Sequence, residues 1–137
     1  MLPDKITLEI ATPDRLVLSE EIDEVILPSV EGYMGVRPGH APLLAALDVG
    51  EISYRKGTEE RLLACSGGFA EVQADSVSIL AETAEPAEEI DVERAKQARQ
   101  RAADRLSADL AENEFKRAEV SLKKAVSRLR VSERRKG

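Results

Sequence analysis

Two residues of this chain are candidate catalytic residues: its single histidine, His40, and its single cysteine, Cys65. A histidine that works as a general base needs a second group to orient it and a hydroxyl or thiol within reach. The serines stand outside nucleophile motifs such as GxSxG. Cys65 lies in the alternating run RLLACSGGF, where a small core side chain is expected. The sequence therefore predicts no catalytic residue, and a small hydrolase built on His40 ranks behind the binding functions considered below.

The stretch around His40, GYMGVRPGHAPLL, also lacks the features of a phosphate loop or a metal site. Its glycines do not match GxGxxG, and no GK[ST] follows. The chain has no HxxxH, no CxxC and no aspartate-rich loop, so no metal site is predicted. Glycines permit tight turns, and Pro38 and Pro42 stiffen the chain between them. We therefore expect residues 31–44 to form a rigid, shaped loop that contacts a partner.

Four basic side chains near the C-terminus have a spacing that suits a polyphosphate. Arg94 and Arg101 are seven residues apart and so share one face of a helix. If the chain reverses near residue 112, Lys124 comes level with Arg101, and Arg128 falls between Arg94 and Arg101. Cations gathered in this way repel one another until a polyphosphate neutralises them. The alternative to a polyphosphate site is a purely structural one, in which Asp91 is only the N-cap of the helix and Arg94 only a solvated surface charge.

Composition divides the chain into two parts. The net charge of −6 combines −9 over residues 1–84 with +3 over residues 85–137. Seven of the eight glycines and five of the six prolines precede residue 85. We therefore predict domains at 1–84 and 85–137, with the boundary in ETAEPAEE. No apolar run reaches the roughly 18 residues of a membrane helix, no secretory signal is recognised, and a lone cysteine suits a reducing compartment.

The first part has the pattern of a β-domain. Ile6–Ile10 alternates with a period of two, as a half-buried strand does. Paired short apolar runs at 52–54 and 62–64, and again at 69–72 and 77–80, are separated by turn residues and predict hairpins. The expected fold class is α+β, with an N-terminal antiparallel β-sandwich or flattened barrel followed by a C-terminal antiparallel helical hairpin.

The second part has the pattern of two helices, at about 91–110 and 113–133. Apolar residues recur at helical spacing, and the short link at 111–113 requires the helices to run antiparallel. Alanine dominates the two facing seams, which include Ala102, Phe115 and Ala118. One alanine methyl contributes on the order of 1 kcal/mol at most when buried. Such a hairpin must lean on the β-domain, a ligand or a partner.

Three motifs carry a resemblance to a known family. The runs LPSVEGYMGVRPGHAPLLAALDVG, SGGFAEV and IDVERA appear in the order and at the separations found in the epsilon subunit of bacterial and chloroplast F-type ATP synthases, which this chain closely resembles over its whole length. The family commonly has a polar, often acidic, pair where this chain has Tyr33-Met34. The resemblance implies a non-catalytic rotor part with gamma, c-ring, alpha and beta subunits as partners. It implies a peripheral position on the cytoplasmic face of the inner cell membrane, reached only through the complex.

The resemblance also implies roles for particular residues. In the family the hairpin can leave the sandwich and hinder ATP hydrolysis, and in some members ATP holds it folded. No cofactor is required; ATP is a possible regulatory ligand. The ATP-binding positions would be Glu85, Ile90, Asp91, Arg94, Ala95, Arg101, Lys124 and Arg128. The contacts to gamma and the c ring would include Glu31, Tyr33, Met34, His40, Pro42 and Leu43. The inhibitory basic face would be Lys123, Lys124, Arg128 and Arg130.

Two alternatives remain open at this point. The basic side chains of the last 23 residues, which carry +7, are also compatible with a solvated helix face. The Gly/Pro loop and the basic helix are also compatible with a free-standing protein-binding module. Nucleic acid is not expected as a partner, because a single-strand binder needs stacking aromatic residues and only 3% of this chain is aromatic.

Overall fold

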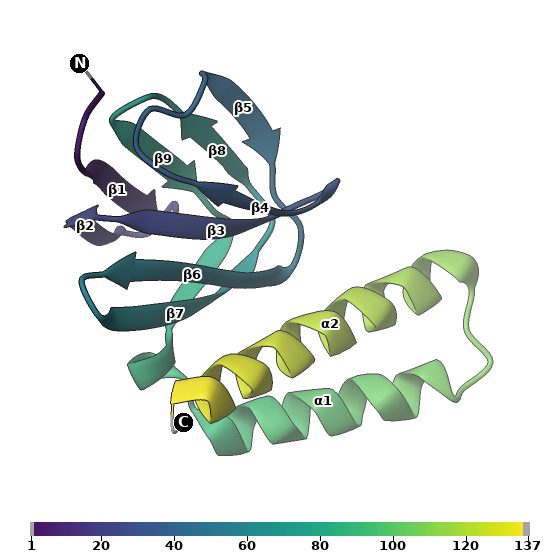
Figure 1. Ribbon diagram of the computed structural model, residues 1–137. Helices are drawn as coiled ribbons and strands as arrows, with labels where there is room; N and C mark the ends of the chain where they lie inside the picture. Colours follow the sequence, from purple (N-terminus) through teal and green to yellow (C-terminus); the bar gives the residue numbers. More distant parts are fainter. Residues whose placement is uncertain (1, 136–137) are drawn as a thin grey trace.

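Ten strands and two helices make up the part of the chain that the computed structural model describes, residues 2–135 (Figure 1). Met1 and the end of the predicted second domain, Lys136 and Gly137, lie outside the described residues. The strands are β1 (Ile6–Ala11), β2 (Leu16–Ile22), β3 (Glu24–Ser29), β4 (Gly32–Val36), β5 (Leu43–Ala46), β6 (Gly50–Lys56), β7 (Glu59–Ser66), β8 (Phe69–Val72), β9 (Ser76–Leu80) and β10 (Thr83–Pro86). A short 3-10 turn, η1 (Ala87–Glu89), leads to α1 (Val92–Leu106) and α2 (Glu112–Arg135).

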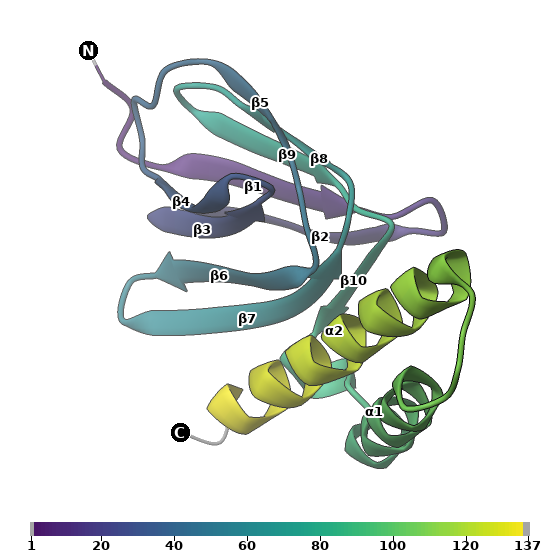
Figure 2. The ribbon, with the colours of Figure 1, turned by 90° about the vertical axis from the view of Figure 1, so that its right-hand side faces the viewer.

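The strands form two five-stranded sheets packed face to face, which confirms the predicted sandwich (Figures 1 and 2). The outer sheet has the order β2-β1-β9-β8-β5, and the helix-facing sheet has the order β10-β7-β6-β3-β4. Ile6, Leu8 and Ile10 point inward and are fully buried, whereas the residues between them are exposed. The alternation in the sequence therefore places the apolar set of β1 in the core.

One strand pair departs from the predicted antiparallel arrangement, because β1 and β9 run parallel. Their register places Leu8 beside Val77 and Ile10 beside Ile79. An alternating pattern identifies a strand and its buried face, but it does not specify the direction of a neighbour that lies far along the chain. Antiparallel pairs follow from tight hairpins, and no hairpin joins β1 to β9.

The predicted boundary between residues 84 and 85 falls inside β10, so the structure places Glu85 and Pro86 in the helix-facing sheet. β10 pairs with β7, and Pro86 lies opposite Leu63. Proline is accommodated because β10 is an edge strand, where a missing N–H leaves no ladder bond unmade. Pro86 ends this strand, and η1 follows directly.

The two helices differ in extent from the predicted ranges. α1 ends at Leu106, four residues before the predicted end, where the Ser107 hydroxyl donates to the Asp104 carbonyl oxygen at 2.7 Å. This side-chain bond to the backbone competes with continuation of the helix. α2 begins at Glu112 and extends to Arg135, two residues beyond the predicted end.

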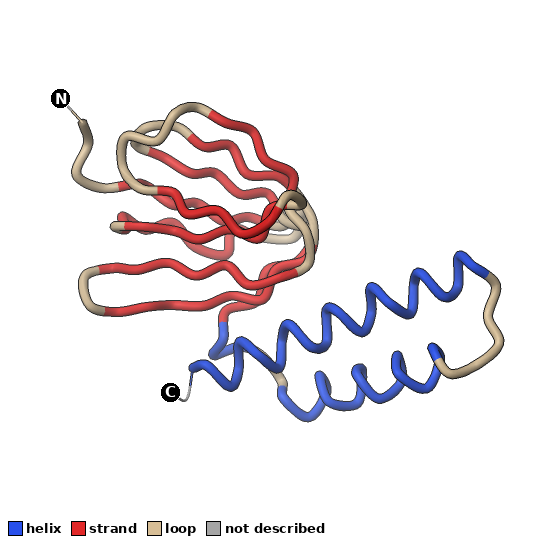
Figure 3. Tube along the Cα trace, turned by 45° about the vertical axis from the view of Figure 1, so that its right-hand side comes forward, coloured by secondary structure: helices blue, strands red, loops and turns tan. Residues whose placement is uncertain are grey.

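The helices lie close together near the sandwich and splay apart toward their connecting loop (Figures 1 and 3). The buried alanines Ala95, Ala102, Ala118 and Ala125 form the predicted seam. Phe115, also assigned to that seam, is 42% exposed, so this part of the prediction is wrong. The divergence of the helices leaves Phe115, in the first turn of α2, partly exposed.

α2 rests on the helix-facing sheet, whereas α1 contacts α2 and lies farther from the strands (Figure 2). The apolar contact between hairpin and sandwich, here called the hairpin seat, consists of the buried residues Leu62, Ala64, Ala87, Ile90 and Val131. The expectation that an alanine-rich hairpin must lean on another surface is confirmed: it leans on the β-domain. The seat is small beside the sandwich core, which buries eighteen residues.

Candidate functional site

A groove of about 390 Å³ opens where the start of α1, the middle of α2 and the end of β10 meet. Its walls come from the consecutive elements β10, η1 and α1 and from α2, which returns to them from farther along the chain. Six of the eight predicted ATP-binding residues line it, together with Glu89 and Ala98: Glu85, Asp91, Arg94, Ala95, Arg101 and Arg128. Its volume falls at the lower end of the range, about 300–1,000 Å³, that is common for small-molecule sites. We call it the hairpin groove.

Asp91 shapes the entrance of the hairpin groove by capping α1. Its Oδ1 accepts a hydrogen bond from the backbone N–H of Arg94 at 3.1 Å, the usual geometry of an N-cap. Asp91 therefore does act as the N-cap of α1, which was the structural alternative to a ligand-binding role. The cap fixes the first turn of α1, and Arg94 and Ala95 of this turn line the groove.

The groove contains more negative charge than the sequence suggested. Four mutually repelling cations were predicted, but Arg128 already forms an ion pair with Glu85, at 2.5 Å between Nε and Oε1. Glu89 pairs with Arg15 at 2.9 Å. Three carboxylates thus accompany three arginines in the lining, because the β10–η1 segment folds back beneath α2. Within the described part of the chain, Arg94 and Arg101 are left without a carboxylate partner.

The two remaining predicted ATP-binding residues lie outside the lining of this groove. Lys124 lines a neighbouring cavity of about 320 Å³ between the helices, which shares Ala98, Arg101 and Arg128 with the groove. That cavity is lined by four basic side chains and by no carboxylate: Arg101, Arg105, Lys124 and Arg128. Ile90 is 9% exposed and belongs to the hairpin seat. It positions the hairpin and does not line the groove.

The predicted basic face of α2 is divided between two sides of the helix. Lys123 and Arg130 are exposed, whereas Lys124 and Arg128 are half-buried beside α1 and the sandwich. Residues one apart differ by about 100° around a helix of 3.6 residues per turn, so these four cannot share one face. Of these four residues, Lys123 and Arg130 are the exposed pair in this conformation.

The stretch 31–44, predicted as a loop, is a strand with a turn at each end. Gly32–Val36 forms β4 at the edge of the helix-facing sheet, paired in register with β3. Glu31, Tyr33 and Met34 therefore lie on or beside the β3–β4 hairpin, while His40, Pro42 and Leu43 follow the other end of β4 (Figure 1). Glycine and proline suggested a loop, but backbone pairing with β3 favours a strand.

The His40 ring is oriented by a backbone carbonyl, and the described residues that contact it supply no nucleophile. Its Nδ1 lies 2.7 Å from the main-chain carbonyl oxygen of Ala41. The preceding turn is held to the outer sheet by a hydrogen bond from the Gly39 N–H to the Ala74 carbonyl at 2.7 Å. Gly39 adopts φ +87°, a conformation that glycine permits. A carbonyl partner fixes an imidazole ring but supplies no attacking group.

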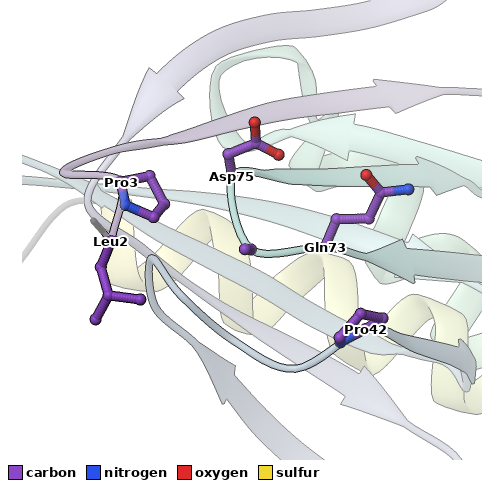
Figure 4. Close-up of a pocket in the computed structure, with 6 residues that line it drawn as sticks. Leu2, Pro3, Pro42, Gln73 and Asp75 are labelled. Carbon is purple, nitrogen blue, oxygen red and sulfur yellow. The ribbon is translucent and has the colours of Figure 1, made fainter.

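Beside this turn lies an open hollow of about 630 Å³, away from the hairpin (Figure 4). Its lining comes from the N-terminal segment, the β4–β5 connection and the β8–β9 turn: Leu2, Pro3, Pro42, Gln73, Ala74 and Asp75. Pro42 is the predicted contact residue among them. The exposed apolar side chains at this end of the sandwich suit a docking surface.

A second exposed surface lies on the outer sheet, and the sequence analysis missed it. Leu44, Phe69 and Leu80 are 68%, 58% and 58% exposed and surround a hollow of about 300 Å³. Phe69 lies directly opposite Leu80 in the β8–β9 ladder. We call these three residues the outer apolar patch. The signal was present in FAEV, where Ala70 and Val72 face inward and so leave the phenylalanine pointing to solvent.

The lone cysteine is a buried core side chain, as its sequence context predicted. Cys65 is 2% exposed within the sandwich core, and burial raises the pKa of its thiol to about 12. The described residues contain no cluster of three His, Cys, Asp or Glu side chains suited to a metal ion. No helix in the described part of the chain is long and apolar enough to cross a membrane.

Comparison with known proteins assigns the family. Residues 5–87 match the family described as "ATP synthase, Delta/Epsilon chain, beta-sandwich domain", and residues 88–133 match "ATP synthase, Delta/Epsilon chain, long alpha-helix domain". The ATP synthase epsilon chain of Syntrophobacter fumaroxidans is 51% identical over 133 residues, which cover 97% of this chain and 99% of that one. The epsilon chain of Halalkalibacterium halodurans is 48% identical over 128 residues, 93% of this chain and 96% of that one. This chain belongs to the ATP synthase epsilon family.

Chains in solved structures of mitochondrial ATP synthases share the fold. A chain in a structure of Euglena gracilis mitochondrial ATP synthase, described as OSCP/F1/c-ring, is 26% identical with a TM-score of 0.83. The match covers all of this chain and 84% of that one. A chain from the Tetrahymena thermophila mitochondrial enzyme, at 18% identity and a TM-score of 0.60 over the full length of both chains, supports the fold alone.

Proposed function

We propose that this chain is a non-catalytic central-stalk subunit of an F-type ATP synthase. In this proposal it couples rotation to ATP synthesis, and its hairpin regulates ATP hydrolysis. Membership of the epsilon family supports the stalk role, and the Euglena relative comes from an assembly that contains F1 and a c ring. The subunit then lies at the cytoplasmic face of the inner membrane, held there by the complex.

Two surfaces of the sandwich are suited to docking. The outer apolar patch lies on the sheet that the hairpin leaves uncovered, and we assign it to the gamma subunit. The β3–β4 turn with Glu31, and the turn with His40 and Pro42, are assigned to the c ring and the adjoining part of gamma. Apolar side chains with this exposure contribute most when a partner excludes water from them.

The hairpin groove carries the regulatory part of the proposal. Its lining residues come from β10, η1, α1 and α2, so the groove exists only while the hairpin is docked on the sandwich. A ligand that binds one conformation stabilises it by mass action, by about 2.7 kcal/mol at 100 times its dissociation constant. ATP bound here therefore favours the docked hairpin. When ATP is scarce, the hairpin leaves its small seat and restrains hydrolysis.

The lining of the hairpin groove suits a nucleotide, because its basic side chains come from α1 and α2, whereas its carboxylates come from the segment that precedes α1. Arg94 and Arg101 have no carboxylate partner in the described structure, and the charged side chains that line the neighbouring cavity are all basic. In this proposal the phosphates lie on the α1–α2 side, because a guanidinium group can bind two phosphate oxygens at once. Carboxylates beside β10 suit hydrogen-bond donors of the base or ribose. Arg128 would exchange Glu85 for a phosphate.

Calorimetry on the isolated full chain tests the nucleotide site. We expect saturable binding of ATP that is lost in Arg94→Ala and reduced in Arg128→Ala. Arg99→Ala is the matched control, because this arginine is exposed on α1 and does not line the groove. Absence of heat at millimolar ATP, or an equal loss in the control, rejects the site but leaves the stalk assignment intact.

Charge reversal tests whether inhibition of ATP hydrolysis by the hairpin depends on the exposed cations of α2. In the assembled enzyme, the double variant Lys123→Glu with Arg130→Glu should relieve inhibition of ATP hydrolysis, more strongly at low salt, where surface charges act at longer range. Reversal of Lys116, an exposed cation near the start of α2 that pairs with Glu112, is the control. Unchanged hydrolysis in the double variant contradicts a role for these two side chains.

A further inference from the structure

Ser127 ties the centre of α2 to the backbone of the sandwich. Its hydroxyl is buried and donates to the carbonyl oxygen of Gly50 at 3.0 Å, a contact across 77 residues of sequence. Gly50 opens β6 and pairs with Cys65 of β7. The hairpin therefore rests on a specific peptide group at the start of β6, in addition to its apolar seat.

Tyr33 lies against the same glycine. A Cβ atom added at Gly50 would meet the Tyr33 hydroxyl oxygen at 2.7 Å and Pro28 Cβ at 2.7 Å, so this approach requires glycine. The Tyr33 hydroxyl donates to Glu51 Oε2 at 2.8 Å and accepts from the Glu51 N–H at 3.1 Å. Two hydrogen bonds thus fix the phenol at the β6 backbone that receives Ser127.

Arg130 brings the charge of α2 to the same place. Burial raises the pKa of the Tyr33 phenol, the hydrogen bond from the Glu51 N–H lowers it, the Glu51 carboxylate raises it, and the positive charge of Arg130 lowers it. Ser127 and Arg130 are three residues apart and so are neighbours on the helix surface. Both act on the β4–β6 region only while the hairpin is docked.

Tyr33 also stands directly after the β3–β4 turn. The Ser29 hydroxyl donates to the Gly32 carbonyl oxygen at 2.6 Å and accepts from the Glu31 N–H at 3.2 Å. These bonds brace the turn, so a displacement of Tyr33 carries Glu31 with it. The path from α2 to the turn passes through one glycine and one phenol.

We propose that Tyr33 couples hairpin docking to the conformation of the β3–β4 turn, so that the rotor-facing end of β4 responds to whether the hairpin is docked. This rests on the proposed function, in which the hairpin leaves the sandwich and the turn contacts the rotor. Departure of α2 removes Ser127 from Gly50 and Arg130 from the phenol. Coupling between two sites is reciprocal, so loosening Tyr33 must also loosen the hairpin.

Hydrogen exchange of the isolated full chain, read by mass spectrometry, tests the coupling in both directions. Tyr33→Phe is expected to increase exchange around Ser127 in α2, and Ser127→Ala is expected to increase exchange across β4. Each change should be about fivefold, the effect of one typical hydrogen bond. Effects in the double variant should be smaller than the product of the single effects, because both changes break one connected path.

Ser132→Ala is the matched control, since this buried hydroxyl donates to the Leu129 carbonyl of its own helix at 2.8 Å. It should leave β4 exchange unchanged. If Ser127→Ala affects β4 no more than this control, or Tyr33→Phe affects only residues beside Glu51, the coupling is rejected. If either variant undocks the hairpin completely, the proposal still requires faster exchange in β4, and unchanged β4 exchange in that case also rejects the coupling. These rates are measured without nucleotide or other subunits, so they do not depend on whether the hairpin inhibits hydrolysis or on whether ATP binds in the hairpin groove.

Discussion

Replacing Val131 with alanine tests whether the hairpin seat holds the hairpin on the sandwich. The Val131 side chain is fully buried in the hairpin seat, which includes residues of β7 and of the β10–α1 connection such as Leu62 and Ile90. It lies outside the cluster that forms the sandwich core. Its truncation should therefore weaken docking of the hairpin and leave the unfolding free energy of the sandwich nearly unchanged.

The expected magnitude follows from the two methyl groups that are removed. A buried carbon of this size contributes about 0.8 kcal/mol, so the transfer term alone is about 1.6 kcal/mol. The remaining cavity adds to this cost, because the neighbours Ala64 and Ala87 are too small to fill it. A total of about 2 kcal/mol corresponds to about a thirtyfold change in the docking equilibrium.

Hydrogen exchange on the full chain measures this change segment by segment. In Val131→Ala, amides of α2 should exchange about thirtyfold faster, while those of β1 and β9 keep their rates. Val120→Ala, at a position 42% exposed on the same helix, should change α2 exchange by less than about threefold. Equal acceleration in sandwich and hairpin would show one cooperative unit, and equal effects of the two variants would show that the seat does not hold the hairpin.

Three further predictions follow from local geometry. Gly68→Ala should lower the unfolding free energy by more than about 3 kcal/mol in urea titrations, because an added Cβ would lie 2.1 Å from the Leu80 carbonyl oxygen at φ +108°. Gly57→Ala, at φ +65° in open space, should lose only about 1–2 kcal/mol, and similar losses in both would contradict the argument. Phe69→Asp should weaken gamma binding at least about tenfold in pulldown assays with an unchanged urea midpoint, and unaltered affinity would reject the outer apolar patch as the gamma contact. Because burial raises the pKa of the Cys65 thiol from 9.0 to about 12, the unfolded chain loses this proton first. Stability should therefore be full below pH 9 and decline as pH rises toward 12, less steeply in Cys65→Ala, and equal slopes in the two proteins would exclude this cause.

Local sequence signals were sufficient to predict much of the hairpin groove. The Asp91 cap and the spacing of Arg94 and Arg101 depend on the start and the period of one helix, which neighbouring residues determine. Arg128 followed from the short link between the helices, which allows only an antiparallel return. The Glu85–Arg128 ion pair did not follow, because it depends on how the edge strand β10 lies beneath α2.

The docking surfaces were harder to predict. The outer apolar patch depends on which face of the outer sheet stays uncovered, and alternation alone does not say where the hairpin rests. β4 was predicted as a loop because glycine and proline lower strand propensity, yet pairing with β3 outweighs that preference. The contact between Tyr33 and Gly50 has no local signal at all.

The sequence by itself determined both helices, many of the strands with the face that each buries, and that the hairpin needs support. These properties repeat every two or 3.6 residues and are specified by side chains close together in the chain. Only the tertiary structure decided that β1 and β9 run parallel, that α2 packs on β6 and β7, and that Ser127 reaches Gly50. Such contacts join residues tens of positions apart, and their geometry is set by the packing of whole sheets and helices.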